Sequence, residues 1–312
     1  MQKRNGWFKR LGADMHRNYD LYLMAIPGIV FYVLFKYWPM YGVQIAFRNY
    51  NAALGITGSP WVGLKWFEKF IHSFQFGSLM SNTFLIAFYS LLVGFPIPII
   101  LALALNANEH PRFKKTVQMV SYAPHFISVV VLVGMMFQMF SARNGIYGAA
   151  IFRLTGTRPA DPFATPGNFR HFYLWSGVWQ DFGWGSIIYL AALAGVDPSL
   201  HEAATVDGAS RFKRVLHVDL PTILPTIVIM LILRFGSIMS IGFEKVYLMQ
   251  YPTNITVSEI ISTHVYKVGM GSTSDMSYAS AIGLFNSVIN CIMLIFVNWL
   301  SKKVSKDEVS MF

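Results

Sequence analysis

Two charged residues lie inside apolar segments of the sequence, where a charge is costly and is usually retained for a function. Asp181 and Arg234 belong to consecutive apolar segments, and a helical rise of about 1.5 Å per residue places both ~12–14 Å from the same end of those segments. Equal depth on neighbouring helices predicts either an ion pair that joins the helices or a direct contact with a solute. The third alternative is that one of the two groups extends outward to water.

Aromatic and amide side chains near these charges have the chemistry to bind a sugar. One helical turn separates the members of three pairs, which are Trp175 and Trp179, Gln180 and Trp184, and Asn286 and Asn290. Flat indole faces suit the C–H groups of sugar rings, and amides suit the hydroxyl groups. The alternatives are that the tryptophans anchor at a membrane interface and that the asparagines bond across helices. The residues predicted to line a solute path are Trp179, Gln180, Asp181, Trp184, Arg234, Asn286 and Asn290.

The sequence contains no residue set with the spacing of a catalytic centre or a metal site. His201-Glu202 is followed by Thr205 at the position where a zinc-protease helix requires a second histidine. Cys291 is the single cysteine, so it can form neither an internal disulfide nor a zinc framework. We therefore expect no catalytic residues and no metal.

The composition indicates a membrane protein. Hydrophobic residues make up 54% of the 312 residues and charged residues only 13%, whereas a soluble domain is about one quarter charged. The mean hydropathy is +0.45. This composition excludes a soluble globular enzyme and a disordered chain. The net charge of +10 does not indicate nucleic acid as a partner, because the basic residues lie in short segments between apolar blocks.

Six apolar blocks have the length of about 20 residues that crosses a bilayer core. They predict an all-α integral membrane protein with transmembrane helices at 21–41, 80–105, 117–140, 172–194, 222–242 and 276–300. Lys and Arg are concentrated on the side of the two termini, although the loop 141–171 is also basic, so we expect both termini in the cytoplasm. The expected layout is a basic cytoplasmic segment (1–20) that also contacts anionic lipid, a membrane domain (21–300) and a cytoplasmic tail (301–312).

The loop 195–221 has the signals of a short exposed helix over residues 198–207. Either Asp197 caps the helix before Pro198, or Ser199 and Glu202 form a capping box, and Gly208 ends the helix. The small residues Ala203 and Ala204 allow a partner protein to approach closely. Glu202 then offers a carboxylate to that partner, or it only caps the helix, a role worth about 1 kcal/mol.

This loop resembles the EAA loop of binding-protein-dependent ABC importer permeases, the MetI-like superfamily. The resemblance rests on Glu202-Ala203-Ala204, then Gly208 after three residues, and Val218-Asp-Leu220-Pro221 after nine more, with Val218 in place of the family's Ile. Further segments resemble the LplB-like oligosaccharide group of the sugar-importing branch. They are Tyr37-Trp-Pro39-Met-Tyr-Gly42, Ala46-Phe47-Arg-Asn-Tyr50, Trp61-Val-Gly63-Leu64, Pro124-His125-Phe126-Ile-Ser128 and Val206-Asp207-Gly208-Ala209.

The resemblance implies a transport subunit in a bacterial plasma membrane that is not itself an enzyme. Its implied partners are a second related permease, two cytoplasmic ATPase subunits that hold ATP and Mg, and an external solute-binding protein that delivers an oligosaccharide. The absence of a G-x-x-x-x-G-K-[ST] phosphate loop agrees, so no cofactor is expected on this chain. The residues implied to couple to the ATPase are Glu202, Ala203, Ala204, Asp207, Gly208, Leu220 and Pro221.

Two other classes of membrane protein remain as alternatives. An ion-coupled secondary transporter or a channel would work without ATPase partners and would need no exposed loop helix. A membrane-embedded hydrolase would need a nucleophile and base, or a metal site, and the sequence offers neither.

Overall fold

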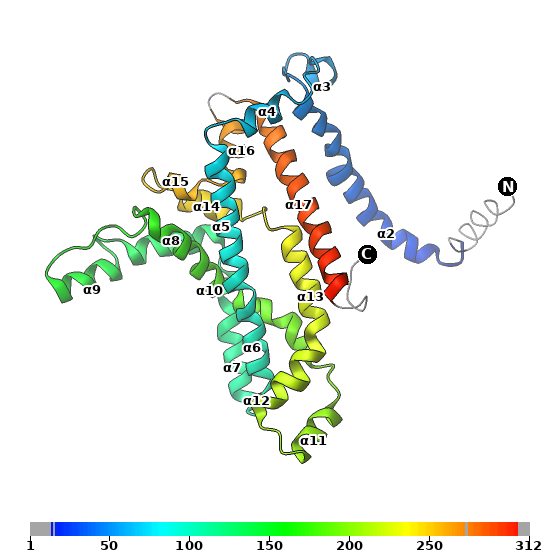
Figure 1. The fold of residues 1–312 in the computed structure, drawn as a ribbon, viewed down its shortest axis with the longest axis vertical. Coiled ribbons are helices and arrows are strands. Elements are labelled where there is room, and N and C mark those ends of the chain that lie inside the picture. Colours follow the sequence, from blue (N-terminus) through cyan, green and yellow to red (C-terminus); the bar gives the residue numbers. More distant parts are fainter. Residues whose placement is uncertain (1–13, 15, 272–273, 305–312) are drawn as a thin grey trace.

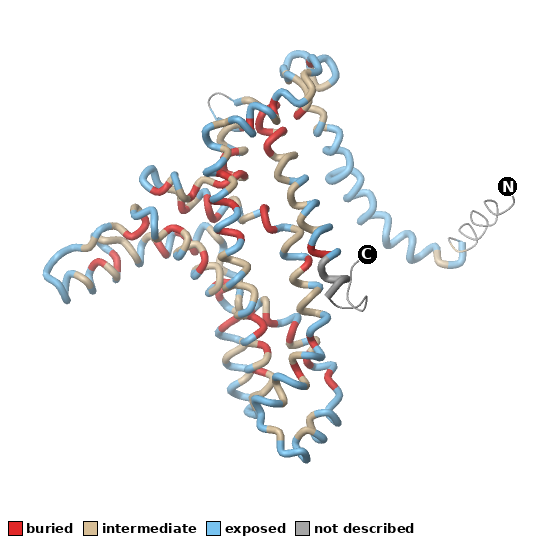
Figure 2. Tube along the Cα trace, in the orientation of Figure 1, coloured by how far each residue is buried: buried red, intermediate tan, exposed pale blue. Residues whose placement is uncertain are grey.

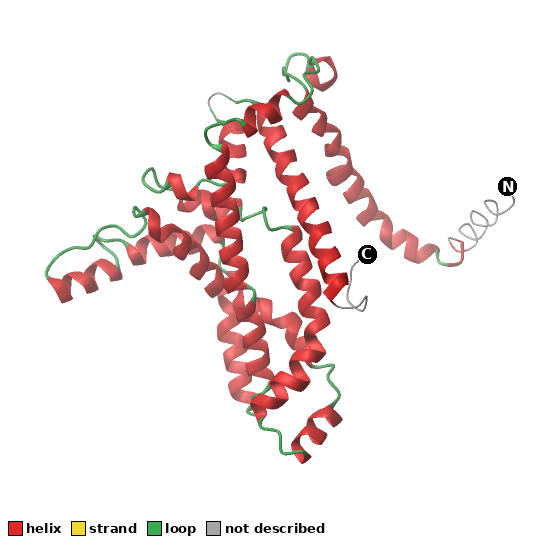
Figure 3. Cartoon of the chain, in the orientation of Figure 1, coloured by secondary structure: helices red, strands yellow, loops and turns green. Residues whose placement is uncertain are grey.

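The computed structural model describes residue 14, residues 16–271 and residues 274–304, the side chains of 300–304 excepted. Most of the expected basic segment 1–20, and residues 305–312 of the expected tail, lie outside the described residues. Within these ranges the chain is helical, and its β structure is limited to two isolated bridges. The predicted all-α class is therefore confirmed (Figure 3).

The elements follow one another with short connections. The first half consists of α2 (Tyr19–Tyr32), η1 (Val33–Tyr37), η2 (Trp38–Phe47), α3 (Gly55–Gly58), α4 (Lys65–Ile71), α5 (Phe76–Gly94), α6 (Pro96–Asn106), α7 (Pro111–Tyr122), η3 (Ala123–Phe126), α8 (Val129–Phe140) and α9 (Ile146–Thr155). The second half consists of η4 (Pro166–Asn168), α10 (Phe169–Leu193), α11 (Pro198–Val206), α12 (Arg211–Arg214), η5 (Val215–Asp219), α13 (Leu220–Gly236), α14 (Phe243–Met249), α15 (Ile255–Ser258), α16 (Ile261–Met270) and α17 (Met276–Val304).

Four helical stretches of the described chain are long and apolar enough to cross a membrane. They are Tyr19–Phe47, Phe76–Asn106, Arg211–Gly236 and Met276–Trp299, and they correspond to the expected first, second, fifth and sixth spans. The expected fourth span is α10, which is continuous but too polar to pass the same test. This polarity arises because α10 carries Arg170, Gln180 and Asp181.

The expected third span, 117–140, is not one straight helix. Pro111–Phe126 and Val129–Phe140 meet at 98°, and the described residues contain five candidate spans if this bent pair is counted as one. The chain is extended at Ile127 and Ser128, and Ser128 Oγ accepts a hydrogen bond from the Val131 backbone N–H to cap α8. α8 and α9 therefore project sideways from the bundle (Figure 1).

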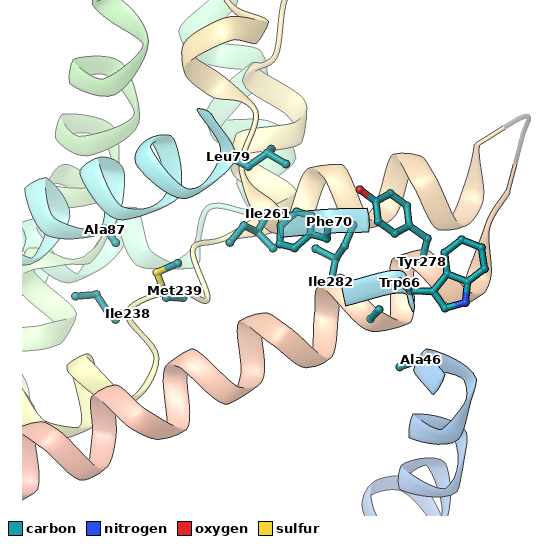
Figure 4. Packing of buried hydrophobic residues seen from close by; sticks show 11 residues of the cluster. Ala46, Trp66, Phe70, Leu79, Ala87, Ile238, Met239, Ile261, Tyr278 and Ile282 are labelled. Atoms are coloured by element: carbon teal, nitrogen blue, oxygen red, sulfur yellow. The ribbon is translucent and has the colours of Figure 1, made fainter. Parts of the chain in front are cut away.

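α10 is the centre of the bundle and packs against α5, α6, α7 and α13. Buried side chains of α6, α10 and α13 form one core cluster, which includes Ile99, Tyr189 and Ile223. A second cluster joins α4, α16 and α17 through Phe70, Ile261 and other buried residues (Figure 4). α2, by contrast, has no buried residue and runs apart from the bundle (Figures 1 and 2).

Gly183 allows the closest approach between α10 and α7, because a Cβ atom there would overlap the backbone carbonyl of Ser121. We expect Gly183→Ala to lower the free energy of unfolding by about 1–3 kcal/mol, since one helix would have to move away from the other. Thermal denaturation in detergent measures the change. Gly134→Ala is the matched control, because a Cβ there has no neighbour within 4 Å and alanine favours the helix. Equal stability of the two variants would contradict the close contact.

Candidate functional site

A cavity of about 580 Å³ lies between α5, α6, α10, α13 and α14. Four of the residues predicted for a solute path line it, which are Gln180, Asp181, Trp184 and Arg234. Two further charged residues of this cavity, Glu244 and Lys245 at the start of α14, were not expected from the sequence. The structure thus brings together the charges and one of the aromatic rings that were proposed from sequence alone.

Asp181 contacts a histidine rather than Arg234. His125 Nδ1 donates a hydrogen bond to Asp181 Oδ1 at 2.9 Å, and no ion pair closer than 4.0 Å joins Asp181 to Arg234. The expected Asp181–Arg234 pair is therefore not formed. Two features explain the difference. α13 ends at Gly236, so Arg234 lies in its last turn, and the break after α7 places His125 beside the middle of α10.

One face of Trp184 is covered in this structure. The His125 ring stacks on it with a centroid distance of 4.4 Å and an interplanar angle of 6°, and Phe126 meets its edge. A sugar could stack on that face only after His125 moved. The segment Pro124-His125-Phe126 is one of those that resemble the family. Its contact with α10 was not predictable from sequence, because it depends on the break in the expected third span.

Trp179 and Gln180 have different surroundings from Trp184. Trp179 faces a separate apolar cleft of about 760 Å³, together with Trp175 and several residues of α8. Gln180 is buried, and its Nε2 donates to the carbonyl of Ile127 at 2.7 Å, so it satisfies a backbone group that the break leaves without a helical partner.

Asn286 and Asn290 on α17 hold the extended chain that follows α13. The Met239 backbone N–H donates to Asn290 Oδ1 at 2.9 Å, and Asn290 Nδ2 donates to Ser240 Oγ at the same distance. Asn286 Nδ2 donates to the Met239 carbonyl at 3.4 Å. These contacts correspond to the alternative of hydrogen bonding across helices, and neither asparagine lines the cavity that contains Asp181.

The two cationic groups of the cavity differ in their contacts. Lys245 is buried, and its Nζ donates to the Tyr173 carbonyl at 3.1 Å and lies 5.0 Å from the centroid of the Tyr173 ring. The carbonyl of Arg234 accepts a hydrogen bond from Ser237 Oγ at 3.3 Å, whereas its guanidinium makes no hydrogen bond or ion pair with any other described residue. A guanidinium without a partner in a cavity is available to an external polar group, because its N–H donors point outward within the plane of the group.

A second candidate site is the loop between α10 and α13, which lies at one end of the long axis of the molecule (Figure 1). Asp197 caps α11 by accepting from the Ser199 backbone N–H at 2.9 Å, and this hydrogen bond holds the pKa of the Asp197 carboxyl below its usual value. Asp197 is thus the N-cap, and Glu202 makes no capping hydrogen bond. The Glu202 carboxylate is exposed and has no partner among the described residues.

The C-terminal end of α11 depends on Gly208. Its φ of +74° is in the left-handed region, and the backbone N–H groups of Gly208 and Ala209 donate to the carbonyls of Thr205 and Ala204. This is a Schellman motif, which a glycine adopts without strain. Asp207 is the exposed C-cap residue, while Leu220 and Pro221 form the first turn of α13.

The outer side of α11 is apolar although the helix is surrounded by solvent. Leu200 is 49% exposed and Val206 is 88% exposed, Ala203 between them is also exposed, and no residue of α11 is buried. A small, apolar, exposed surface beside a free carboxylate is suited to docking into a groove of another protein. Figure 2 shows the exposure of the whole helix.

Comparison with known proteins identifies the family of the chain. The family described as "Binding-protein-dependent transport system inner membrane component" matches residues 94–306, which include both candidate sites. The chain belongs to this family. The permease is therefore a subunit of a multicomponent transport system, and the resemblance inferred from the loop 195–221 is confirmed.

Two relatives of the permease occur in Bacillus subtilis (strain 168). It is 40% identical to Protein LplB over 95% of this chain and 92% of LplB. It is also 40% identical to the polygalacturonan/rhamnogalacturonan transport system permease protein YteP, over 96% of this chain and 93% of YteP. A crystal structure of a bacterial alginate ABC transporter, in complex with an alginate pentasaccharide-bound periplasmic protein, contains a chain with a TM-score of 0.86 and 34% identity. That match covers 97% of this chain and 100% of the chain of the alginate transporter.

Proposed function

We propose that the permease forms the membrane path of an ABC importer for an oligosaccharide and that separate ATPase subunits drive it through α11. The observation that carries this proposal is the exposed α11, with its apolar outer side and its free Glu202 carboxylate. Its short connections to α10 and α13 mean that a displacement of α11 acts directly on two helices that line the cavity. The residues proposed to contact the ATPase are Glu202, Ala203, Ala204, Asp207 and Gly208, with Leu220 and Pro221 supporting them.

The cavity at Asp181 is the proposed solute path. Trp184 offers an aromatic face, and Arg234 offers free hydrogen-bond donors, which together match the apolar and polar sides of a sugar. The names of YteP and of the alginate transporter refer to oligosaccharide or polysaccharide import, which supports the same class of solute. Trp179, Gln180, Asn286 and Asn290 remain part of the proposal as residues that position the walls of the path.

We propose six membrane crossings, with α10 and the bent pair of α7 and α8 completing the four long apolar stretches. Both termini would then face the cytoplasm of a bacterial cell, on the side of α11. The basic residues of the loop 195–221 support this orientation, since loops rich in Lys and Arg remain in the cytoplasm.

The proposed assembly contains a second, related permease, two ATPase subunits with ATP and Mg, and an external binding protein. The second permease and the lipid of the membrane would together cover the apolar cleft at Trp175 and Trp179 and the unburied helix α2. ATP-driven movement of α11 would alternate the access of the cavity between the two sides of the membrane.

The test is to purify the permease with and without its co-expressed partners and to reconstitute both preparations into liposomes. We expect import only with all partners and ATP, and co-purification of the ATPase subunits that is lost when α11 is replaced by a Gly/Ser linker. Import by the permease alone, driven by an ion gradient, would favour a secondary transporter and would overturn the proposal.

A further inference from the structure

A buried carboxylate joins the loop helix α11 to the bundle. The Asp219 side chain is only 2% exposed, and Asp219 is the only acidic residue that is buried among the described residues. Its Oδ1 accepts hydrogen bonds from His201 Nε2 at 3.1 Å and from Asn106 Nδ2 at 3.2 Å. One oxygen atom thus connects α11, the last residue of α6 and the residue that precedes α13.

α11 has few other attachments to the rest of the chain. Only His201 and Ala204 of this helix are half-buried, and its other residues are exposed. The other side-chain hydrogen bond that leaves the helix runs from Arg214 Nη1 to Thr205 Oγ1 at 2.9 Å. A cleft of about 460 Å³ lies beside this contact and is lined by His201, Glu202, Arg211 and the end of α6. Without His201, α11 would therefore be held mainly by its two covalent connections.

Burial makes the contact at Asp219 strong and specific. A buried carboxylate is stable only when hydrogen-bond donors or a charge compensate for its lost hydration, so Asp219 holds its two donors in place. Asp219 also ends the π-helical turn η5 directly before α13, and single π turns are frequent at functional positions of helices. A shift of His201 therefore pulls on the start of α13 and on the end of α6 together.

We propose that the His201–Asp219 hydrogen bond is the joint that transmits the displacement of α11 to α6 and α13. The inference rests on the proposed role of α11 as the docking helix, and it adds the route by which the movement reaches the cavity. His201 is a positioning residue in this mechanism. It touches neither the solute cavity nor the exposed outer side of α11.

The first experiment measures the joint in the permease itself. Spin labels on Val206→Cys and His110→Cys, in a Cys291→Ser background, report the distance between α11 and the chain that follows α6. All three native side chains are exposed. We expect a narrow distance distribution with native His201, a broad one with His201→Ala, and a narrow one again with His201→Gln, whose amide also donates. An unchanged width in His201→Ala would overturn the proposal, whether or not α11 docks an ATPase.

The second experiment measures transmission in the assembled importer. We expect His201→Ala to retain the ATPase subunits and to hydrolyse ATP, while solute imported per ATP falls on the order of tenfold. His201→Gln should restore this ratio. His217→Ala is the matched control, because that histidine lies in the same loop and its ring bonds, among the described residues, only to the Lys213 carbonyl of its own turn. A normal ratio of solute imported per ATP in His201→Ala would overturn the proposed role of His201 and leave the docking role of α11 intact. Failure of the wild-type permease to bind the ATPase subunits would instead contradict the docking role.

Discussion

Replacing Gly208 with valine is expected to reduce import by about 5- to 30-fold, the factor that corresponds to ~1–2 kcal/mol of left-handed strain. The φ of +74° at this position is costly for any side chain and most costly for a β-branched one. A Cβ at Gly208 meets no atom within 4 Å, so the defect arises from the backbone and not from a clash within the chain. The helix end would unwind and α11 would lose its docking orientation. ATP-dependent import into proteoliposomes measures the effect.

The control for this prediction is Gly208→Asn, because asparagine tolerates the left-handed conformation better than other residues. The asparagine variant should retain most of the import that the valine variant loses. Glu202→Ala is a second test of the same surface. Glu202 has no partner within the described chain, so the loss of its carboxylate should weaken only the attachment of the ATPase. Normal import by both Gly208→Val and Glu202→Ala would contradict the docking role of α11.

Replacing Asp181 with alanine is the second change with a large expected effect. It frees His125, which the Asp181 carboxylate holds at 2.9 Å, and thereby disturbs the ring that covers Trp184. We expect lower thermal stability and import reduced on the order of tenfold. A double-mutant cycle with His125→Ala should show a coupling energy of roughly 0.5–3 kcal/mol, the range for groups in contact.

The matched control is a second double-mutant cycle, which combines Asp181→Ala with Arg234→Ala. Asp181 and Arg234 line the same cavity without an ion pair, so their effects on stability should add within about 0.5 kcal/mol. A larger coupling energy of Asp181 with Arg234 than with His125 would contradict this prediction and would indicate the Asp181–Arg234 ion pair that the sequence suggested. Thermal denaturation of the six proteins in detergent, wild type included, provides all of the required comparisons.

The helix α11 was predictable because its determinants are local. A capping aspartate, a proline in the first turn and a glycine after the last turn specify its ends without help from the rest of the fold. Four of the six expected spans were predictable for the same reason, since hydropathy over about 20 residues indicates a helix that can cross a membrane. Hydropathy alone does not identify α10 as a span, because polar residues lower the mean hydropathy of this helix at the centre of the bundle.

The partners of the polar residues were not predictable, because they depend on where helices break. A break at Ile127 and Ser128 brings His125 to Asp181, and the end of α13 at Gly236 places Arg234 in the last turn of that helix. The burial of Asp219 depends on the packing of α6, which is distant in sequence. Its only sequence signal was its position between Val218 and Leu220 in the loop motif.

The polarity of α10 has a consequence for how the permease is made. An aspartate at the centre of a helix opposes insertion by the translocon by about 2.5–3.5 kcal/mol, and α10 also carries Gln180 there. The helices that pack against α10 from earlier in the chain, α5, α6 and α7, are synthesised first. Membrane integration of α10 is thus expected to depend on α5, α6 and α7, and mutations in the faces of these helices that pack on α10 should appear as biogenesis defects rather than as altered transport.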